Sequence, residues 1–181
     1  DGFPHFMLKE IHQQPEVIRN TLRGRISDDA SDVNLSDINI SEADIKACPR
    51  ITIVACGTSW HAGMVGKYLI ERFAEIPVEL DLASEYRYRD PIVEKNAIVI
   101  PVSQSGETAD TMEAVRLAKS QGARILAVVN TVGSSVARES NGVIYLQAGP
   151  EVSIASTKAY TTQVTAFALL TIWLARIRGT M

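Results

Sequence analysis

Short apolar runs alternate with longer segments of helical periodicity from residue 51 onward, and this alternation constrains the fold more than any other feature of the sequence. The runs at residues 97–100 and 125–129 are apolar at every position. Strands without a polar face are typical of parallel sheets that helices cover on both sides. The pattern therefore predicts an α/β domain, a three-layer α/β/α sandwich that is doubly wound around its sheet.

The boundaries of the expected elements follow from the same pattern. We expect five strands, at residues 50–56, 77–82, 97–102, 124–130 and 142–146, and helices at residues 60–74, 108–120, 134–139 and 157–178. Residues 6–22 have apolar side chains at helical spacing, and Pro15 predicts either one broken helix or two short ones. Residues 25–46 are rich in Ser, Asp and Asn, which favours a surface connection. We therefore expect an N-terminal helical segment and linker, residues 1–46, followed by one domain, residues 47–181.

Composition disfavours several classes of partner. The net charge of -3 and the scattered Lys and Arg residues argue against nucleic acid. Cys48 and Cys56 form no CxxC motif, so we expect no metal site, no disulfide and a cytoplasmic location. The last helix is apolar almost all round, but its Thr and Gln residues argue against a membrane span and favour burial against a partner subunit or domain. Because the chain begins at Asp1 and stops at Met181 directly after this helix, we interpret it as a piece of a longer protein.

The strongest candidate site is the turn from Ser103 to Thr108, between an expected strand and an expected helix. It combines three hydroxyl side chains with Gly106, and the free N–H groups of a helix start can join those hydroxyls on one phosphate without a cation. Ligands of doubly wound sheets bind at this carboxyl edge, where the strand order reverses. The alternative is that Ser105 only caps the helix. Glu107 argues mildly against a phosphate unless its carboxylate points away.

Two further segments could complete a site for a polyhydroxylated ligand. The turn from Cys56 to Ser59 repeats the hydroxyl-rich arrangement after the first strand, and residues 151–158 offer hydroxyls, one acid and Lys158 before the last helix. Either segment could instead be a plain turn with a helix cap, with Cys56 buried and Lys158 solvated. The sequence contains no GxxxxGK[ST] and no GxGxxG after a strand, so ATP and NAD are weak candidates and we expect no cofactor.

A general base for sugar chemistry is harder to find in this sequence. The candidates are the acids and the histidine near expected strand ends, Glu85, Glu107, Glu151 and His61. None of them forms an evident pair, and a lone histidine at such a position is more often structural. We expect Glu85 in a salt-bridge cluster with Arg87 and Arg89 rather than as a base.

Four segments together resemble one known family, and they lie at residues 55–59, 83–89, 103–111 and 155–163. They are similar to the first sugar isomerase (SIS) domain of the glutamine–fructose-6-phosphate aminotransferases, which make glucosamine 6-phosphate. The leading segment from His5 to Pro15 also resembles the entry into that family's isomerase half. The turn at residues 103–108 marks SIS domains generally, whereas residues 55–59 and 155–159 together are specific to the aminotransferases.

The resemblance implies a flavodoxin-like, five-stranded parallel sheet and a fructose 6-phosphate or glucosamine 6-phosphate ligand. It implies phosphate contacts for four residues of one turn, Ser103, Gln104, Ser105 and Thr108. Further ligand contacts are implied for Thr58 and Ser59, and a segment bordering the sugar for Ile154 and Ser156. It also implies a cytoplasmic homodimer that acts in hexosamine biosynthesis, and a last helix that needs a cover fits a dimer.

The family's other parts are missing from this sequence. In the family, a glutaminase domain, a second SIS domain and a C-terminal tail accompany this segment, and the isomerisation base, the ring-opening histidine and the lysine that attacks the ketose lie in those parts. We therefore assign no catalytic residue here and expect a substrate-binding half that is inactive alone. One alternative is a free-standing phosphosugar isomerase, in which Glu85, Glu151 or His61 would be catalytic. The other is a non-catalytic sugar-phosphate sensor, for which residues 1–50 show no DNA-binding character.

Overall fold

The computed structural model describes residues 2–35 and 38–181 and contains a five-stranded, all-parallel sheet. The strands are β1 Ile51–Ala55, β2 Val78–Leu82, β3 Ile98–Ser103, β4 Arg124–Val129 and β5 Gly142–Tyr145, in the order β2-β1-β3-β4-β5. The register places Ile51 beside both Val78 and Ile98. The predicted flavodoxin-like sheet is confirmed. Asp1, Ser36 and Asp37 of the expected N-terminal segment lie outside the described residues.

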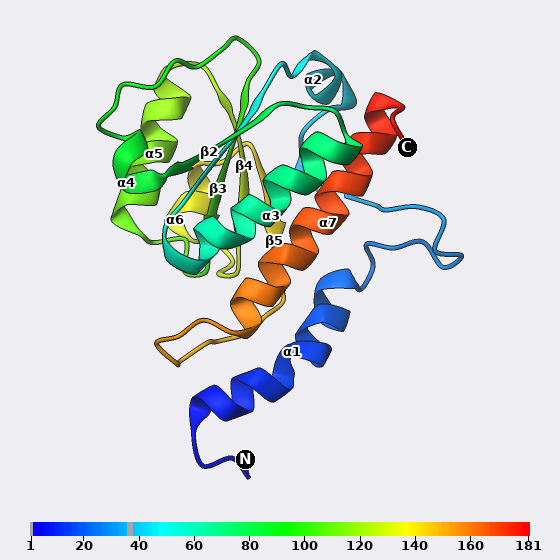
Figure 1. Ribbon diagram of the computed structural model, residues 1–181, viewed down its shortest axis with the longest axis vertical. Helices are drawn as coiled ribbons and strands as arrows, with labels where there is room; N and C mark the ends of the chain where they lie inside the picture. The colour runs from blue at the N-terminus through cyan, green and yellow to red at the C-terminus, as the bar shows by residue number, and fades with distance from the viewer. Residues whose placement is uncertain (1, 36–37) are drawn as a thin grey trace.

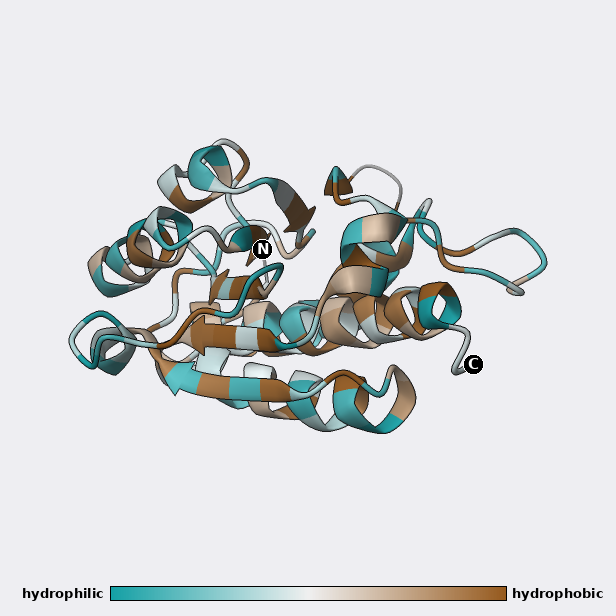
Figure 2. Cartoon of the chain, turned by 90° about the horizontal axis from the view of Figure 1, so that it is seen from above, coloured by the Kyte–Doolittle hydropathy of each residue, from teal (hydrophilic) through white to brown (hydrophobic). Residues whose placement is uncertain are grey.

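Helices cover both faces of this sheet (Figure 1). One face carries α4 Ala83–Tyr86, α5 Ala109–Ser120 and α6 Ser135–Glu139, and the other carries α3 Gly57–Phe73 and α7 Lys158–Arg178. Alternate residues of β3 serve the two layers: Ile98, Ile100 and Val102 join the core beneath α3 and α7, whereas Val99 joins the core beneath α5. Figure 2 shows the apolar residues gathered in the strands between the helical layers. The predicted three-layer sandwich is thus confirmed.

The long helix α7 is covered by its own chain. On one side it packs against α3, where a Cβ built on Gly66 would lie 2.6 Å from Phe167 Cγ, so only glycine allows this approach. On its other side lies α1, Phe6–Leu22 (Figure 1). The N-terminal helix therefore supplies a cover that we expected from a partner. Within the described residues, no helix is both long and apolar enough to cross a membrane.

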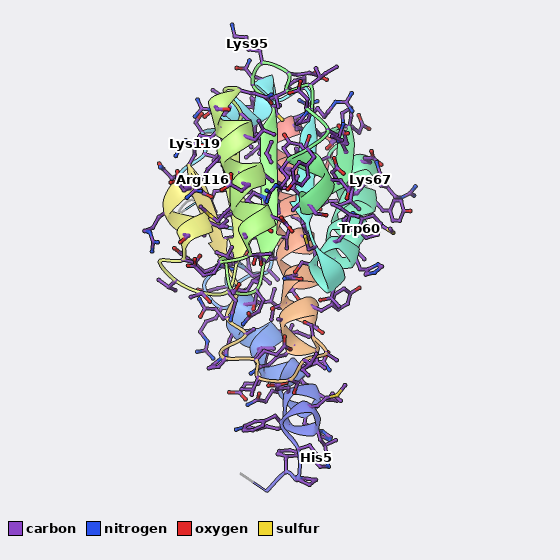
Figure 3. All side chains as sticks on the ribbon, turned by 90° about the vertical axis from the view of Figure 1, so that its left-hand side faces the viewer. His5, Trp60, Lys67, Lys95, Arg116 and Lys119 are labelled. Carbon is purple, nitrogen blue, oxygen red and sulfur yellow. The ribbon has the colours of Figure 1, made fainter. Side chains whose placement is uncertain are left out.

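Helix α1 is continuous through Pro15, so the prediction of a broken helix or two short helices is wrong. Proline has no N–H to offer the carbonyl of Ile11, one helical turn earlier. The side-chain amide of Gln14 donates to that carbonyl instead, at 3.0 Å. The helix runs on past the sheet, so that His5 at its start lies at the opposite end of the molecule from Lys95 (Figure 3).

The segment expected as a surface connection contains a helix and part of the core. Helix α2, Glu42–Ala47, begins with a capping box in which the Ser41 hydroxyl accepts from the N–H of Asp44 at 3.1 Å. Three apolar side chains before it are buried: Leu35, Ile38 and Ile40. The prediction followed the polar residues 27–32, which are largely exposed, and overlooked the apolar ones behind them. The domain boundary between residues 46 and 47 stays a prediction.

Candidate functional site

The turns after β1 and β3 meet at one place, where the strand order reverses. The chain passes from β1 to β2 on one side and then crosses to β3 on the other, so β1 and β3 are neighbours that leave the sheet in opposite senses. A pocket of about 240 Å³ opens at their carboxyl ends and is lined by Cys56, Ser59, Val102, Ser103, Gln104, Ser105, Thr108 and Thr111. None of these side chains carries a charge. An anion in this pocket would have to be held by N–H and O–H donors.

The turn from Ser103 to Thr108 is folded by its own hydroxyls. The buried Ser103 Oγ accepts from the N–H of Gly106 at 2.9 Å and lies 3.3 Å from Thr108 Oγ1. Ser105 Oγ accepts from the N–H of Glu107 at 3.1 Å. Helix α5 begins after this turn, with Thr108 at its N-cap and no side-chain capping bond. The alternative in which Ser105 caps the helix is therefore wrong, and the first turn of α5 keeps N–H groups that no carbonyl of the helix can reach.

Gly106 lets this turn approach the next crossover closely. Its φ is +67°, in the left-handed region, and a Cβ built there would lie 2.6 Å from Ser134 Cβ. Its carbonyl accepts from the N–H of Val136 at 3.1 Å, and the carbonyl of Gln104 accepts from the N–H of Asn130 at 3.2 Å. The turn is thus fixed to the loop after β4 as well as to β3.

Glu107 points away from the pocket. Its carboxylate accepts from the backbone N–H of Ser135 at 2.8 Å, at the start of α6. This hydrogen bond lowers the pKa of Glu107 from its ordinary value, so the side chain stays ionised there. The Glu107 carboxylate therefore does not argue against a phosphate in the pocket, because its charge is directed to the start of α6.

The turn after β1 contributes Ser59 to the pocket, whereas Thr58 is exposed in the first turn of α3 and is not among the lining residues. Ser59 Oγ accepts from Gln163 Nε2 of α7 at 2.9 Å. Gln163 is 1% exposed, and its Oε1 has no partner among the described residues. Sequence reasoning used Gln163 only as an argument against a membrane span and gave it no part in the site, although a Gln in an otherwise apolar helix is a signal that could have drawn attention to it.

The segment before α7 is held by Glu151. Its carboxylate accepts from the Ser156 hydroxyl at 3.0 Å and from the N–H of Thr157 at 2.8 Å, so an acid from outside the helix caps it. Ile154 is fully exposed and Ser156 is half-buried, and neither lines the pocket of about 240 Å³. Glu151 lines a neighbouring pocket of about 440 Å³, and Gln104 lines both.

Lys158 is not solvated, so the alternative that made it a solvated side chain is wrong. It is 4% exposed, and its Nζ donates to Gln13 Oε1 of α1 at 2.9 Å. The expectation overlooked α1, which reaches the start of α7 from the far end of the sequence.

The remaining acid and histidine candidates stand apart from the pocket. Arg87 pairs with Asp110 at 2.9 Å, and Arg89 pairs with Glu79 and Asp81, so these arginines do not form the expected cluster with Glu85. The acidic partners of these arginines lie on β2 and α5, and their distance in the sequence gave no sign of these pairs. His61 is exposed, with its ring edge-on to Trp60 at 5.2 Å between centroids. Neither Glu85 nor His61 lines the pocket at β1 and β3.

Comparison with known proteins gives consistent matches in sequence. A family model described as the SIS domain matches residues 44–173. The chain is 58% identical over 178 residues to the glutamine–fructose-6-phosphate aminotransferase [isomerizing] of Symbiobacterium thermophilum, and 49% identical over 180 residues to that of Thermus thermophilus. These matches cover 98% and 99% of this chain but 29% of the length of each relative. The chain thus spans less than a third of these relatives.

Solved structures give the same picture of the fold. The C-terminal domain of glucosamine-fructose-6-phosphate aminotransferase from Francisella tularensis matches with a TM-score of 0.94 and 40% identity, over 100% of this chain and 51% of that chain. Glucosamine-6-phosphate deaminase from Thermotoga maritima matches with a TM-score of 0.76 and 21% identity, over 98% of this chain and 50% of that one. The second match shows a shared fold alone.

Proposed function

Because this chain belongs to the SIS domain family, we propose that it binds a hexose 6-phosphate, either fructose 6-phosphate or glucosamine 6-phosphate, at the carboxyl ends of β1 and β3. Four residues would hold the phosphate: Ser103, Gln104, Ser105 and Thr108. Thr58 and Ser59 would contact the rest of the ligand, and Ile154 and Ser156 would border the sugar. The N–H groups at the start of α5 would add donors without any cation.

One observation supports this proposal most. Two hydroxyl-rich turns that lie far apart in the sequence line a single uncharged pocket. A dianionic phosphate needs several converging donors, and the hydroxyls of Ser103, Ser105 and Thr108 lie beside the open start of a helix there. The relatives named for aminotransfer to fructose 6-phosphate match over nearly the whole chain, which favours a sugar phosphate over other anions.

We further propose that the chain is the sugar-phosphate-binding half of the isomerase part of a cytoplasmic, isomerising aminotransferase in hexosamine biosynthesis. Its partners there would be a glutaminase domain and a second SIS domain. Support comes from the aminotransferase relatives, which are much longer than the stretch they share with this chain. Cys48 and Cys56 both carry free thiols, which agrees with a reducing compartment.

Calorimetric titration tests the binding site. We expect fructose 6-phosphate to bind and fructose to give no heat at the same concentration. Ser105→Ala should weaken binding by roughly tenfold or more, because a hydrogen bond to a charged group is lost. Ser120→Ala, at the far end of α5 where the hydroxyl only donates to the Leu117 carbonyl, is the matched control and should bind as the parent does. No heat with millimolar fructose 6-phosphate would contradict the proposal.

A free-standing isomerase has less support. It would need a base at Glu85, Glu151 or His61, yet the Glu151 carboxylate caps α7, and the other two lie away from the pocket. The sugar-phosphate sensor has no further observation in its favour. We expect the isolated chain to leave fructose 6-phosphate unchanged. Measurable conversion to glucose 6-phosphate by the purified chain would overturn this assignment.

We also propose that two copies associate through the start of α1. Several large apolar side chains are exposed in and just before this helix: Phe3, Phe6, Met7, Leu8 and Ile11. Several large apolar side chains exposed within one short segment favour a protein interface there. Sedimentation should give a dimer that Phe6→Asp converts to a monomer, and a monomeric parent at high concentration would refute the proposal.

A further inference from the structure

A carboxylate of the N-terminal helix is buried against the segment that precedes α7. Glu10 of α1 is 2% exposed. Its Oε1 accepts from the N–H of Val152 at 2.6 Å, and both its oxygens lie within hydrogen-bond distance of the N–H of Ser153, at 3.4 and 3.3 Å. Two consecutive backbone groups, separated from Glu10 by more than 140 residues of sequence, are therefore held by one side chain.

The same segment, residues 151–156, here called the sugar-side loop, is tied at its other end as well. The Glu151 carboxylate accepts from the hydroxyl of Ser156 and from the N–H of Thr157. Between these two attachments, Ile154 is fully exposed. The loop thus has no apolar anchor at its centre, and the carboxylates of Glu10 and Glu151 fix its path.

The Glu10 charge is balanced inside the structure. Burial alone would raise the pKa of Glu10, but hydrogen bonds from Ser153 and Val152, together with the charge of Lys158, outweigh it and lower the pKa. Lys158, at the start of α7, is 4% exposed. Burying a carboxylate is costly, and the hydrogen bonds and nearby charge that offset this cost add little net stability compared with an apolar side chain of the same size. A stabilising role alone is therefore a poor account of the buried Glu10 carboxylate.

We propose that Glu10 is a positioning residue for the sugar half of the site. By holding the backbone of Val152 and Ser153, it sets where Ile154 and Ser156 stand relative to the phosphate turn. This inference rests on the proposed sugar-phosphate site. It makes α1, which lies outside the matched family segment of residues 44–173, part of the construction of that site.

The test compares two ligands on one variant. Glu10→Gln keeps the size of the side chain and one acceptor oxygen, but it replaces the other oxygen, which lies 3.3 Å from the N–H of Ser153, with an NH₂ group that cannot accept a hydrogen bond. We expect the Kd for fructose 6-phosphate to rise roughly fivefold or more, as for one lost hydrogen bond, and the Kd for glycerol 3-phosphate, which offers the phosphate end alone, to stay unchanged. Hydrogen exchange at the amides of Val152 and Ser153 should accelerate, while exchange at residues 103–108 should not.

Glu16→Gln is the matched control, because Glu16 lies on the same helix and is exposed. It should change none of these readouts. If Glu10→Gln fails to fold because the buried charge of Lys158 is no longer balanced by a nearby carboxylate, the double variant Glu10→Gln/Lys158→Met removes both charges. It should fold and still bind fructose 6-phosphate more weakly than Lys158→Met alone.

The outcomes separate the two proposals. Normal fructose 6-phosphate binding by Glu10→Gln, or equal weakening for both ligands, would overturn the positioning role while leaving the sugar-phosphate site in place. A parent chain that binds neither ligand would overturn the proposed function and, with it, this role for Glu10.

Discussion

Replacing Gly106 with alanine tests how tightly the candidate phosphate turn is built. The substitution has two costs that can be separated. A φ of +67° costs an L-residue about 1–2 kcal/mol. The new Cβ would also lie 2.6 Å from Ser134 Cβ, and such overpacking in a rigid site costs a further 1–3 kcal/mol, roughly. We therefore expect Gly106→Ala to lower the free energy of unfolding by about 2–5 kcal/mol.

The chain contains a matched control for the first cost. Gly133 has a φ of +69°, and a Cβ built there would meet nothing within 4 Å. Gly133→Ala should therefore cost only the backbone component, about 1–2 kcal/mol. The difference between the two alanine variants then measures the contact with Ser134.

Urea unfolding of a double-mutant cycle completes the test. Ser134→Gly removes the atoms that the new Cβ would meet, and it loses a hydroxyl that accepts from the N–H of Ala137. Glycine at an N-cap costs only a few tenths of a kcal/mol, so the double variant Gly106→Ala/Ser134→Gly should recover most of the second cost. A coupling energy below about 0.5 kcal/mol between the two positions, or equal losses for Gly106→Ala and Gly133→Ala, would refute the reasoning.

Three further predictions concern stability and binding. The pKa of Glu10 is lowered from 4.5, so the unfolded chain takes up a proton at a higher pH than the folded chain does, and the free energy of unfolding should fall below about pH 4.5. Glu10→Gln should therefore make the urea midpoint of unfolding less dependent on pH between about 5 and 3. Parallel pH profiles for the parent and the variant would contradict this prediction. Gly66→Ala should destabilise the chain by about 1–3 kcal/mol, because its Cβ would overlap the ring of buried Phe167, and an unchanged thermal midpoint would count against this packing. Gln163→Leu removes a buried oxygen that has no partner in the described part of the chain, together with the donor to Ser59. Stability should therefore stay nearly unchanged, while calorimetry should show fructose 6-phosphate binding weakened roughly fivefold. A large loss of stability with normal binding would show that the amide serves packing instead.

The sheet could be predicted from the sequence because the pattern of apolar residues that marks each strand lies within a few consecutive positions. Runs such as residues 125–129 are apolar on both faces, a pattern typical of parallel strands that helices cover on each side. The turn from Ser103 to Thr108 could be proposed as a site for the same reason, since its three hydroxyls lie within six residues of sequence, and its phosphate contacts stay a prediction.

What escaped prediction depends on partners that lie far apart in the sequence. Nothing near Lys158 indicates that Gln13 will reach it, and nothing near Arg87 indicates that Asp110 will be its partner. In the continuous helix α1, the side-chain amide of Gln14 donates to the carbonyl that the N–H missing from Pro15 would have reached. Each of these contacts joins polar groups whose meeting is decided by the packing of helices, which periodicity does not record.

Two carboxylates at helix starts also limit where an anion can bind at this edge of the sheet. Glu107 occupies the start of α6, and Glu151 occupies the start of α7. Each acts as a built-in counter-charge, so an incoming dianion finds those two electropositive helix ends already neutralised. At the starts of α3 and α5 the chain places hydroxyls, among them Ser59 and Thr108, and the one carboxylate in the first turn of α5, Asp110, is paired with Arg87. We therefore expect a phosphate to bind where the starts of α3 and α5 meet, rather than at the start of α6 or α7.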